Sequence, residues 1–177
     1  MKLIITTGMP GAGKEEFLIA ASDSGIPFIR MGDIVREFHA KRSEEDKDLS
    51  VGQLANLDRQ RYGFDIWATR AMEKRSGDMF MIDGCWSMDE VRAYRNLTDD
   101  VNIVGIFASP KTRYDRLVKR GREDAPKDIG EFNERDNREL GWGLGETMAL
   151  ADRMIINESS LEDFKRDVRE LMEAFRR

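Results

Sequence analysis

A glycine-rich segment near the beginning of the chain has the spacing of a phosphate-binding loop. The apolar run Leu3–Thr7 predicts a strand, and Gly8-x-x-x-x-Gly13-Lys14 follows it directly. The glycines permit a sharp turn that aims successive backbone N–H groups at a polyphosphate. A helix that begins near Lys14 adds its positive end, and the Lys14 ammonium can reach the terminal phosphates. The residues predicted to bind a nucleoside triphosphate are Gly8, Met9, Pro10, Gly11, Ala12, Gly13, Lys14, Glu15 and Glu16.

The residue after this lysine departs from the usual pattern. Ser or Thr, whose hydroxyl binds Mg²⁺, is normal at that position, whereas this chain has Glu15. A carboxylate can approach a metal, but it also repels phosphate. The loop therefore predicts nucleotide binding, and efficient catalysis does not follow from it. The alternative is a glycine-rich turn between a strand and a helix, with an exposed lysine.

A second chemical group stands at the end of another predicted strand. Asp83 closes the apolar run Met79–Ile82 and precedes Gly84. A carboxylate at the end of a buried strand, beside a phosphate-binding loop, is well placed to hold Mg²⁺ or its water ligands. Asp83 is therefore the predicted metal-binding residue, and the alternative is an aspartate that only shapes a turn.

The elements that must position these groups alternate along the chain. Apolar runs separated by longer amphipathic stretches predict an α/β fold, with a parallel sheet and crossover helices. Serines with Glu or Gln three residues later, or with a following proline, mark helix starts at Ser50, Ser87, Ser109 and Ser159. The last helix is expected over Leu161–Phe175. The expected strands are Leu3–Thr7, Pro27–Met31, Met79–Asp83, Val101–Ala108 and Arg153–Asn157.

Length and composition indicate one globular domain. The chain has 177 residues, 40% hydrophobic and 36% charged, with a net charge of −5. The negative charge argues against broad binding to nucleic acid or anionic membrane, and the absence of a long apolar run argues against a membrane span. One cysteine and one histidine argue against a disulfide or a zinc site, and they fit a cytoplasmic protein. Cys85 and His39 are interpreted as bystanders.

Several longer segments make the chain resemble the nucleoside monophosphate kinase group of P-loop proteins, which includes adenylate kinase and dephospho-CoA kinase. The chain is especially similar to an archaeal family described as adenylate-kinase-related, which has no settled substrate. The segments that carry the resemblance are GMPGAGK at 8–14, MGDIVRE at 31–37, MIDG at 81–84, ASPKTRYDRLVKRGRED at 108–124, ERDNRELGWG at 134–143 and ADRMIINESSLEDF at 151–164.

The resemblance implies a three-layer P-loop NTPase fold with a five-stranded parallel sheet and helices on both faces. It also implies two functional segments inside a single domain. An acceptor-binding insertion would span about 37–76, and a short lid about 119–145. The remaining residues, 1–36, 77–118 and 146–177, would form the core.

The resemblance assigns the segment after the second strand to the acceptor. Arg36 would bind an acceptor phosphate, and Asp33 would be a catalytic base if the acceptor is a hydroxyl. The alternative is that Asp33 caps a helix and Arg36 is a solvated charge. An arginine is expected shortly after Asp83-Gly84, but residues 85–88 are Cys-Trp-Ser-Met. Arg92, together with Arg95, is the candidate that compensates for this missing arginine.

The lid is expected to supply the remaining cations. By the resemblance, Arg120, Arg122, Arg135 and Arg138 would close over the phosphates, and Arg135 and Arg138, three apart on a helix, would share a face. Arg116 and Asn157 would contact the bound nucleotide, Asn157 at its adenine or ribose. The alternative for the lid arginines is an exposed, salt-bridged helix, because acidic residues alternate with them. The alternative for Asn157 is a turn.

The leading hypothesis is a P-loop kinase that transfers the γ-phosphate of ATP or GTP, with Mg²⁺, to a small nucleotide or nucleotide-like acceptor. The competing hypothesis is an NTP-binding switch or slow NTPase that acts on a protein partner. Glu15 and the missing arginine after Asp83 favour the second. The acceptor, the choice between ATP and GTP, and the oligomeric state remain open at this point.

Overall fold

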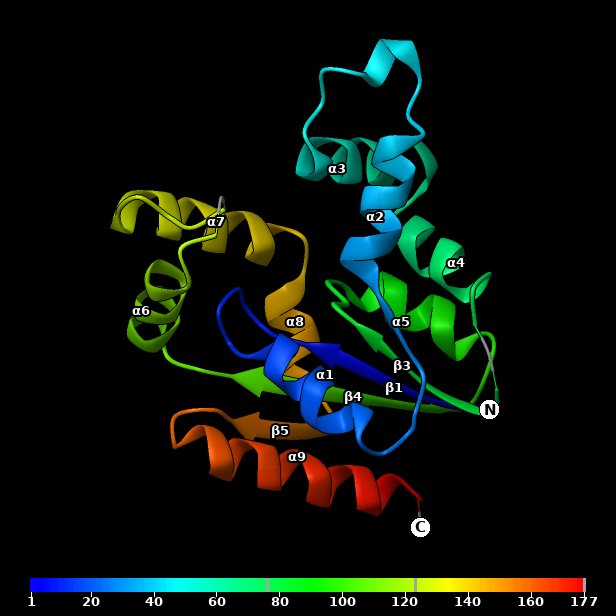
Figure 1. The fold of residues 1–177 in the computed structure, drawn as a ribbon. Helices are drawn as coiled ribbons and strands as arrows, with labels where there is room; N and C mark the ends of the chain where they lie inside the picture. Colours follow the sequence, from blue (N-terminus) through cyan, green and yellow to red (C-terminus); the bar gives the residue numbers. More distant parts are fainter. Residues whose placement is uncertain (76, 123, 177) are drawn as a thin grey trace.

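A five-stranded parallel sheet forms the centre of the molecule, as the computed structural model shows for residues 1–75, 77–122 and 124–176 (Figure 1). The strand order is β2-β3-β1-β4-β5, so the first strand is central. This confirms the predicted α/β class and number of strands, and each predicted strand end lies within one residue of the observed one. The strands are β1 Lys2–Thr7, β2 Phe28–Arg30, β3 Met79–Asp83, β4 Asp100–Phe107 and β5 Arg153–Ile156.

Helices cover both faces of the sheet. On one face α1 packs beside α9, around buried side chains such as Phe17 and Phe164. On the other face α2, α4 and α5 enclose Trp67 and Tyr94. The helices are α1 Lys14–Ser22, α2 Met31–Ala40, α3 Val51–Tyr62, α4 Ile66–Met72, α5 Met88–Arg95, α6 Pro110–Arg120, α7 Ile129–Gly141, α8 Leu144–Ala149 and α9 Leu161–Arg176, with a 3₁₀ turn η1 at Glu44–Asp46.

The predicted helix starts agree with the observed caps, with one exception. Ser50 forms a capping box with Gln53, and the Ser87 and Ser109 hydroxyls each accept a hydrogen bond from the backbone three residues later. At the last helix the cap is Ser160, whose Oγ accepts from the Asp163 N–H at 3.1 Å, and not Ser159. Ser159 has Glu162 three residues later, as the pattern requires, whereas Ser160 has Asp163; α9 begins one residue later than Ser159 requires.

Two groups of helices rise from the carboxyl edge of the sheet on either side of β1 (Figure 1). The segment expected to bind the acceptor, 37–76, contains the end of α2, then η1, α3 and α4. The expected lid, 119–145, contains the end of α6, then α7 and the start of α8. The expected boundaries at 36/37 and 118/119 thus fall within helices. No helix among the described residues has the length and apolar character needed to cross a membrane.

Candidate functional site

The phosphate-binding loop lies between β1 and α1, where the sequence places it. Gly11 and Gly13 have φ angles of +83° and +109°, which side chains other than glycine rarely adopt. A Cβ on Gly11 would also lie 2.8 Å from the Arg113 carbonyl oxygen, so the loop is packed against α6. Among the described residues no side chain caps α1 at Gly13, which leaves the helix start to an anion.

Lys14 turns back over this loop. Its Nζ donates a hydrogen bond to the Gly8 carbonyl oxygen at 2.5 Å and lies 3.5 Å from that of Met9. Desolvation lowers the pKa of Lys14, and the carboxylates of Asp83 and Glu139 oppose this shift by raising it. The negative charge of a bound polyphosphate would raise the pKa of Lys14 in the same way. Lys14 is therefore suited to bind one.

This lowered pKa predicts how triphosphate binding depends on pH. In the free protein Lys14 loses its charge at a lower pH than an exposed lysine, whereas bound phosphates favour the charged form. Binding therefore takes up a proton above the lowered pKa, and affinity should fall as the pH rises through it. Titration calorimetry from neutral pH towards the ordinary lysine pKa would measure the fall. A Lys14→Arg variant should not show it, and a flat wild-type profile would contradict the assignment.

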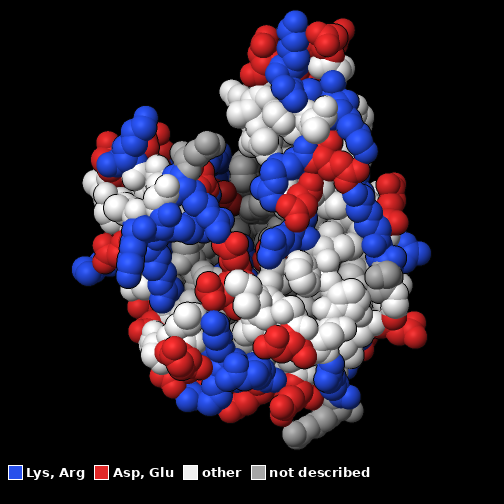
Figure 2. All heavy atoms as spheres, in the orientation of Figure 1, with Lys and Arg blue, Asp and Glu red and all other residues white. Residues whose placement is uncertain are grey.

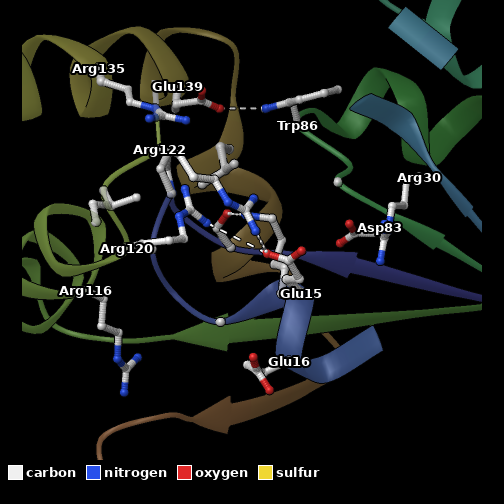
Figure 3. Close-up of a pocket in the computed structure, with 18 of the residues that line it drawn as sticks. Glu15, Glu16, Arg30, Asp83, Trp86, Arg116, Arg120, Arg122, Arg135 and Glu139 are labelled. Carbon is white, nitrogen blue, oxygen red and sulfur yellow. Dashed lines mark hydrogen bonds and ion pairs between the residues drawn. The ribbon is translucent and has the colours of Figure 1, made fainter. Parts of the chain in front are cut away.

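A cavity of about 430 Å³ opens above the loop. Cationic side chains stand on both sides of the hollow between the helices of the two segments, with acidic side chains between them (Figure 2). Figure 3 shows that Arg116, Arg120, Arg122 and Arg135 come from α6 and the residues after it, whereas Arg30 lies across the cavity beside Asp83. Of the predicted loop residues, Gly8, Pro10, Gly11, Gly13, Lys14, Glu15 and Glu16 line the cavity.

Asp83 lies at the floor of this cavity. Its carboxylate accepts a hydrogen bond from the Thr6 hydroxyl at 2.8 Å, and β-sheet register sets it opposite Thr6 and Arg30. Fixed oxygen donors beside phosphates suit Mg²⁺, which is usually held by one or two carboxylates together with substrate phosphates. The described residues hold no cluster of three or more His, Cys, Asp or Glu side chains that could bind a metal by themselves. Asp83 therefore fits a metal that is shared with a nucleotide.

Glu15 pairs with arginines of the opposite wall. Its Oε2 accepts a hydrogen bond from Arg122 at 2.6 Å and lies 4.0 Å from Arg120. Arg135 is bound to Asp124, with a nitrogen–oxygen distance of 3.0 Å. Arg138 does not line the cavity, and its guanidinium lies 5.9 Å from the centre of the Trp142 ring. Arg135 and Arg138 are thus not brought to the phosphate site together.

The predicted acceptor residues are less closely grouped. Arg36 lines the cavity and forms an exposed ion pair with Asp33, which lies outside the lining. Arg92 is paired with Asp89 on the surface of α5 and also lies outside it.

Asn157 and Arg116 support the loop from the side of β5. The Asn157 amide donates to the Ala12 carbonyl oxygen at 2.8 Å, and Asn157 is buried. Arg116 donates to the backbone oxygen of Asn157 at 3.0 Å and lines the cavity. Asn157 therefore joins the end of β5 to the loop, whereas Arg116 is the member of this pair that faces the cavity.

Among the residues of the site that were not predicted, four carry charge or an aromatic ring. Arg30 and Trp86 line the cavity at the ends of β2 and β3, and Glu139 lines it from α7. Arg113 is buried and donates to the Pro10 carbonyl oxygen at 3.2 Å while its guanidinium binds Asp136. A helical spacing of four residues between Arg135 and Glu139 was the one signal in the sequence for Glu139.

Replacing Glu15 with Ser tests the unusual position of the loop. The change removes a carboxylate beside the phosphates, releases Arg122 and Arg120, and restores the hydroxyl that binds Mg²⁺ in this motif. We expect Mg·ATP to bind roughly tenfold more tightly. Titration calorimetry measures the change, and Glu16→Ser, at a neighbouring carboxylate of the cavity paired with Lys165, is the matched control. Equal or weaker binding by Glu15→Ser would refute this explanation.

Comparisons with known proteins identify the family of this chain. A family model for an AAA domain matches residues 7–132. The UPF0200 protein of Thermoplasma volcanium is 42% identical over 171 residues, covering 96% of this chain and 96% of the relative. That of Thermococcus onnurineus is 39% identical over 178 residues, covering 97% and 96%. This chain belongs to the UPF0200 family.

Membership of the UPF0200 family confirms the resemblance to an archaeal P-loop family. The crystal structure of TT1252 from Thermus thermophilus has the same overall fold, with a TM-score of 0.63. It is 14% identical and covers 98% of this chain and 97% of that one, so it supports the fold alone. The loop geometry and the family model together make this UPF0200 chain a nucleotide-binding P-loop domain of the kinase-like class.

Proposed function

We propose that this UPF0200 protein is a Mg²⁺-dependent kinase that transfers the γ-phosphate of ATP or GTP to a small nucleotide or nucleotide-like acceptor. The observation that carries the proposal is one cavity lined by three groups: the phosphate-binding loop, arginines from the lid side, and Arg30 with Arg36 opposite them. A cavity with cations on both sides of a donor loop suits a reaction in which two anionic substrates meet.

In the proposed reaction an acceptor oxygen forms a bond to the γ-phosphorus while the bond from that phosphorus to the bridging oxygen breaks. The nucleoside diphosphate leaves with that oxygen. Gly8–Lys14 holds the donor, and Lys14 and the lid arginines stabilise its charge. Arg30 and Arg36 hold the acceptor. Mg²⁺, bound by Asp83 and the phosphates, would supply further neutralisation.

Acceptor-dependent phosphate transfer tests the proposal. Purified protein is incubated with Mg·ATP and either AMP, CMP, UMP, dephospho-CoA or no acceptor, and the products are followed by mass. A phosphorylated acceptor, formed by the wild type and not by Lys14→Ala, is the expected result. Nucleoside diphosphate formed equally in every tube would contradict it.

A second candidate is an NTP-binding switch or slow NTPase that acts with a protein partner. Glu15 occupies the position of the metal-binding hydroxyl and is paired with Arg122 and Arg120, which favours slow turnover. The same assay separates the two functions, because a switch hydrolyses ATP at a rate that does not depend on the acceptor.

A further inference from the structure

Glu139 is a carboxylate of the cavity to which neither function above gives a role. It lies on α7, one helical turn after Arg135, and its Oε2 accepts a hydrogen bond from the Trp86 indole N–H at 2.6 Å (Figure 3). Trp86 follows β3, on the same side as Arg30 and Asp83. The bond therefore joins the lid helix to the acceptor side of the cavity and fixes the carboxylate there.

Glu139 adds a negative charge to a part of the cavity that also holds cations: it accepts a hydrogen bond from Trp86, and its charge raises the pKa of both Lys14 and Arg59. Glu139 and Asp83 both line the cavity that holds Lys14, so both carboxylates lie beside the predicted phosphate site. Trp86 occupies a position at which a cation was expected. A phosphate beside Glu139 would be repelled, whereas a hydroxyl or amino group could donate a strong hydrogen bond to it.

Trp86 itself is held from behind by a buried ion pair. Arg59 of α3 lies 4.9 Å from the centre of the Trp86 ring and 5.0 Å from that of Trp142, and these two rings meet at 85°. The guanidinium therefore occupies the corner between two perpendicular rings. Arg59 and Glu90 of α5 are 3.6 Å apart, with side chains 1% and 0% exposed.

This buried pair is costly for the fold. Burial raises the pKa of Glu90 and lowers that of Arg59, although each charge partly offsets the other. Among the described residues, Arg59 Nη2 and Glu90 Oε1 have no hydrogen-bond partner. Replacing a buried pair of this kind by apolar residues is often neutral or stabilising, so stability alone does not account for it, and its contact with the Trp86 ring is the role tested below.

We infer that Glu139 determines acceptor specificity by accepting a hydrogen bond from a hydroxyl or amino group of the acceptor, and that Arg59 is a positioning residue that keeps Trp86 and Glu139 in place. The inference rests on the proposed kinase function and adds the chemistry of the acceptor. An anionic group of the acceptor lies at Arg30 and Arg36, and a neutral donor group, from a ribose or from a base, lies at Glu139.

The test compares acceptor kinetics in matched variants. Wild type, Glu139→Ala, Trp86→Phe, Arg59→Lys and the control Glu134→Ala, an exposed residue of α7 outside the cavity, are assayed with Mg·ATP. The acceptors are AMP, dAMP, IMP, CMP, dCMP and UMP. Calorimetry gives the affinity of each variant for ATP and for each acceptor, and thermal melting shows whether the variant is folded.

Glu139→Ala should raise the acceptor KM roughly 10- to 100-fold, with a smaller change in kcat and with ATP affinity retained. Trp86→Phe and Arg59→Lys should raise KM in the same direction. In the Trp86→Phe protein, Glu139→Ala should raise the acceptor KM by a smaller factor than it does in the wild type, because the two residues act together. If Glu139→Ala leaves the KM for dAMP and dCMP unchanged, the group that donates to Glu139 is a ribose hydroxyl. If it leaves the KM for IMP and UMP unchanged, that group is an amino group of the base.

The outcomes separate this inference from the proposed function. Product formation with the same KM in Glu139→Ala and Glu134→Ala overturns the inference and leaves the kinase function standing. Acceptor binding that Glu139→Ala weakens, without any phosphorylated product, supports the inference and overturns the kinase function. If the folded wild-type protein neither binds nor phosphorylates any of these acceptors, both are overturned.

Discussion

Lys14→Ala is expected to lower the affinity for a nucleoside triphosphate roughly 100-fold or more, so that binding is no longer measurable. The ammonium lies inside the loop and donates to the Gly8 carbonyl oxygen, and α1 begins at the same residue. Removing it deletes the one side-chain cation of the loop, so the loop itself keeps only backbone groups that can hold the phosphates. Titration calorimetry with Mg·ATP measures the loss.

Two features make this result interpretable. Desolvation already lowers the pKa of Lys14, so its removal should not weaken the fold, and the melting temperature should be retained. Lys111→Ala is a suitable control, because this exposed lysine lies outside the cavity and pairs with Asp115 on the surface of α6. Unchanged ATP affinity in Lys14→Ala would overturn the whole account of the site.

Arg113→Met is expected to give the largest loss of stability, about 3–5 kcal/mol in the free energy of unfolding. The Arg113 guanidinium binds both carboxylate oxygens of Asp136, at 2.8 and 2.5 Å, and its centre lies 4.9 Å from the ring centre of the buried Phe132. Methionine keeps much of the aliphatic volume but leaves the Asp136 charge poorly solvated and without its partner. Urea denaturation measures the change.

The charge explanation has its own control. Arg113→Met combined with Asp136→Leu removes both charges and should recover much of the lost stability, because no unpaired carboxylate remains. Arg166→Met, at an exposed arginine of α9 paired with Asp163, should change stability little. No recovery in the double variant would show that packing, rather than the unpaired charge, causes the loss. Since Arg113 also binds the Pro10 carbonyl oxygen, ATP affinity should fall in the single variant.

The fold and the donor loop were predictable because their signals are local. Gly8–Lys14 is a continuous motif, and the apolar runs predicted the ends of the strands to within one residue. Arg30, Arg113, Trp86 and Glu139 were not predicted, because their roles depend on contacts between distant segments. Trp86 and Glu139 are 53 positions apart, and Arg113 and Pro10 are 103 positions apart. Such pairs are created by the order of strands in the sheet, which residue spacing does not encode.

The lid shows the limit of reading helical faces from spacing. Residues three and four positions apart are both neighbours on a helix, so Arg138 and Glu139 were equally eligible partners for Arg135. In the structure Glu139 lines the cavity and accepts a hydrogen bond from Trp86, whereas Arg138 lies near the Trp142 ring. Both contacts involve residues outside α7, which the spacing within the helix does not reveal.

The central place of β1 has a consequence for how the chain is made. This strand pairs with β3, which ends at Asp83, and with β4, which ends at Phe107. During synthesis β1 therefore leaves the ribosome long before either neighbour exists, with two unpaired edges and an apolar sequence. Contacts between residues so far apart slow folding and prolong the period in which such a strand is open to aggregation. The newborn chain should thus be most prone to aggregation until about residue 107 has emerged and β4 can pair with β1.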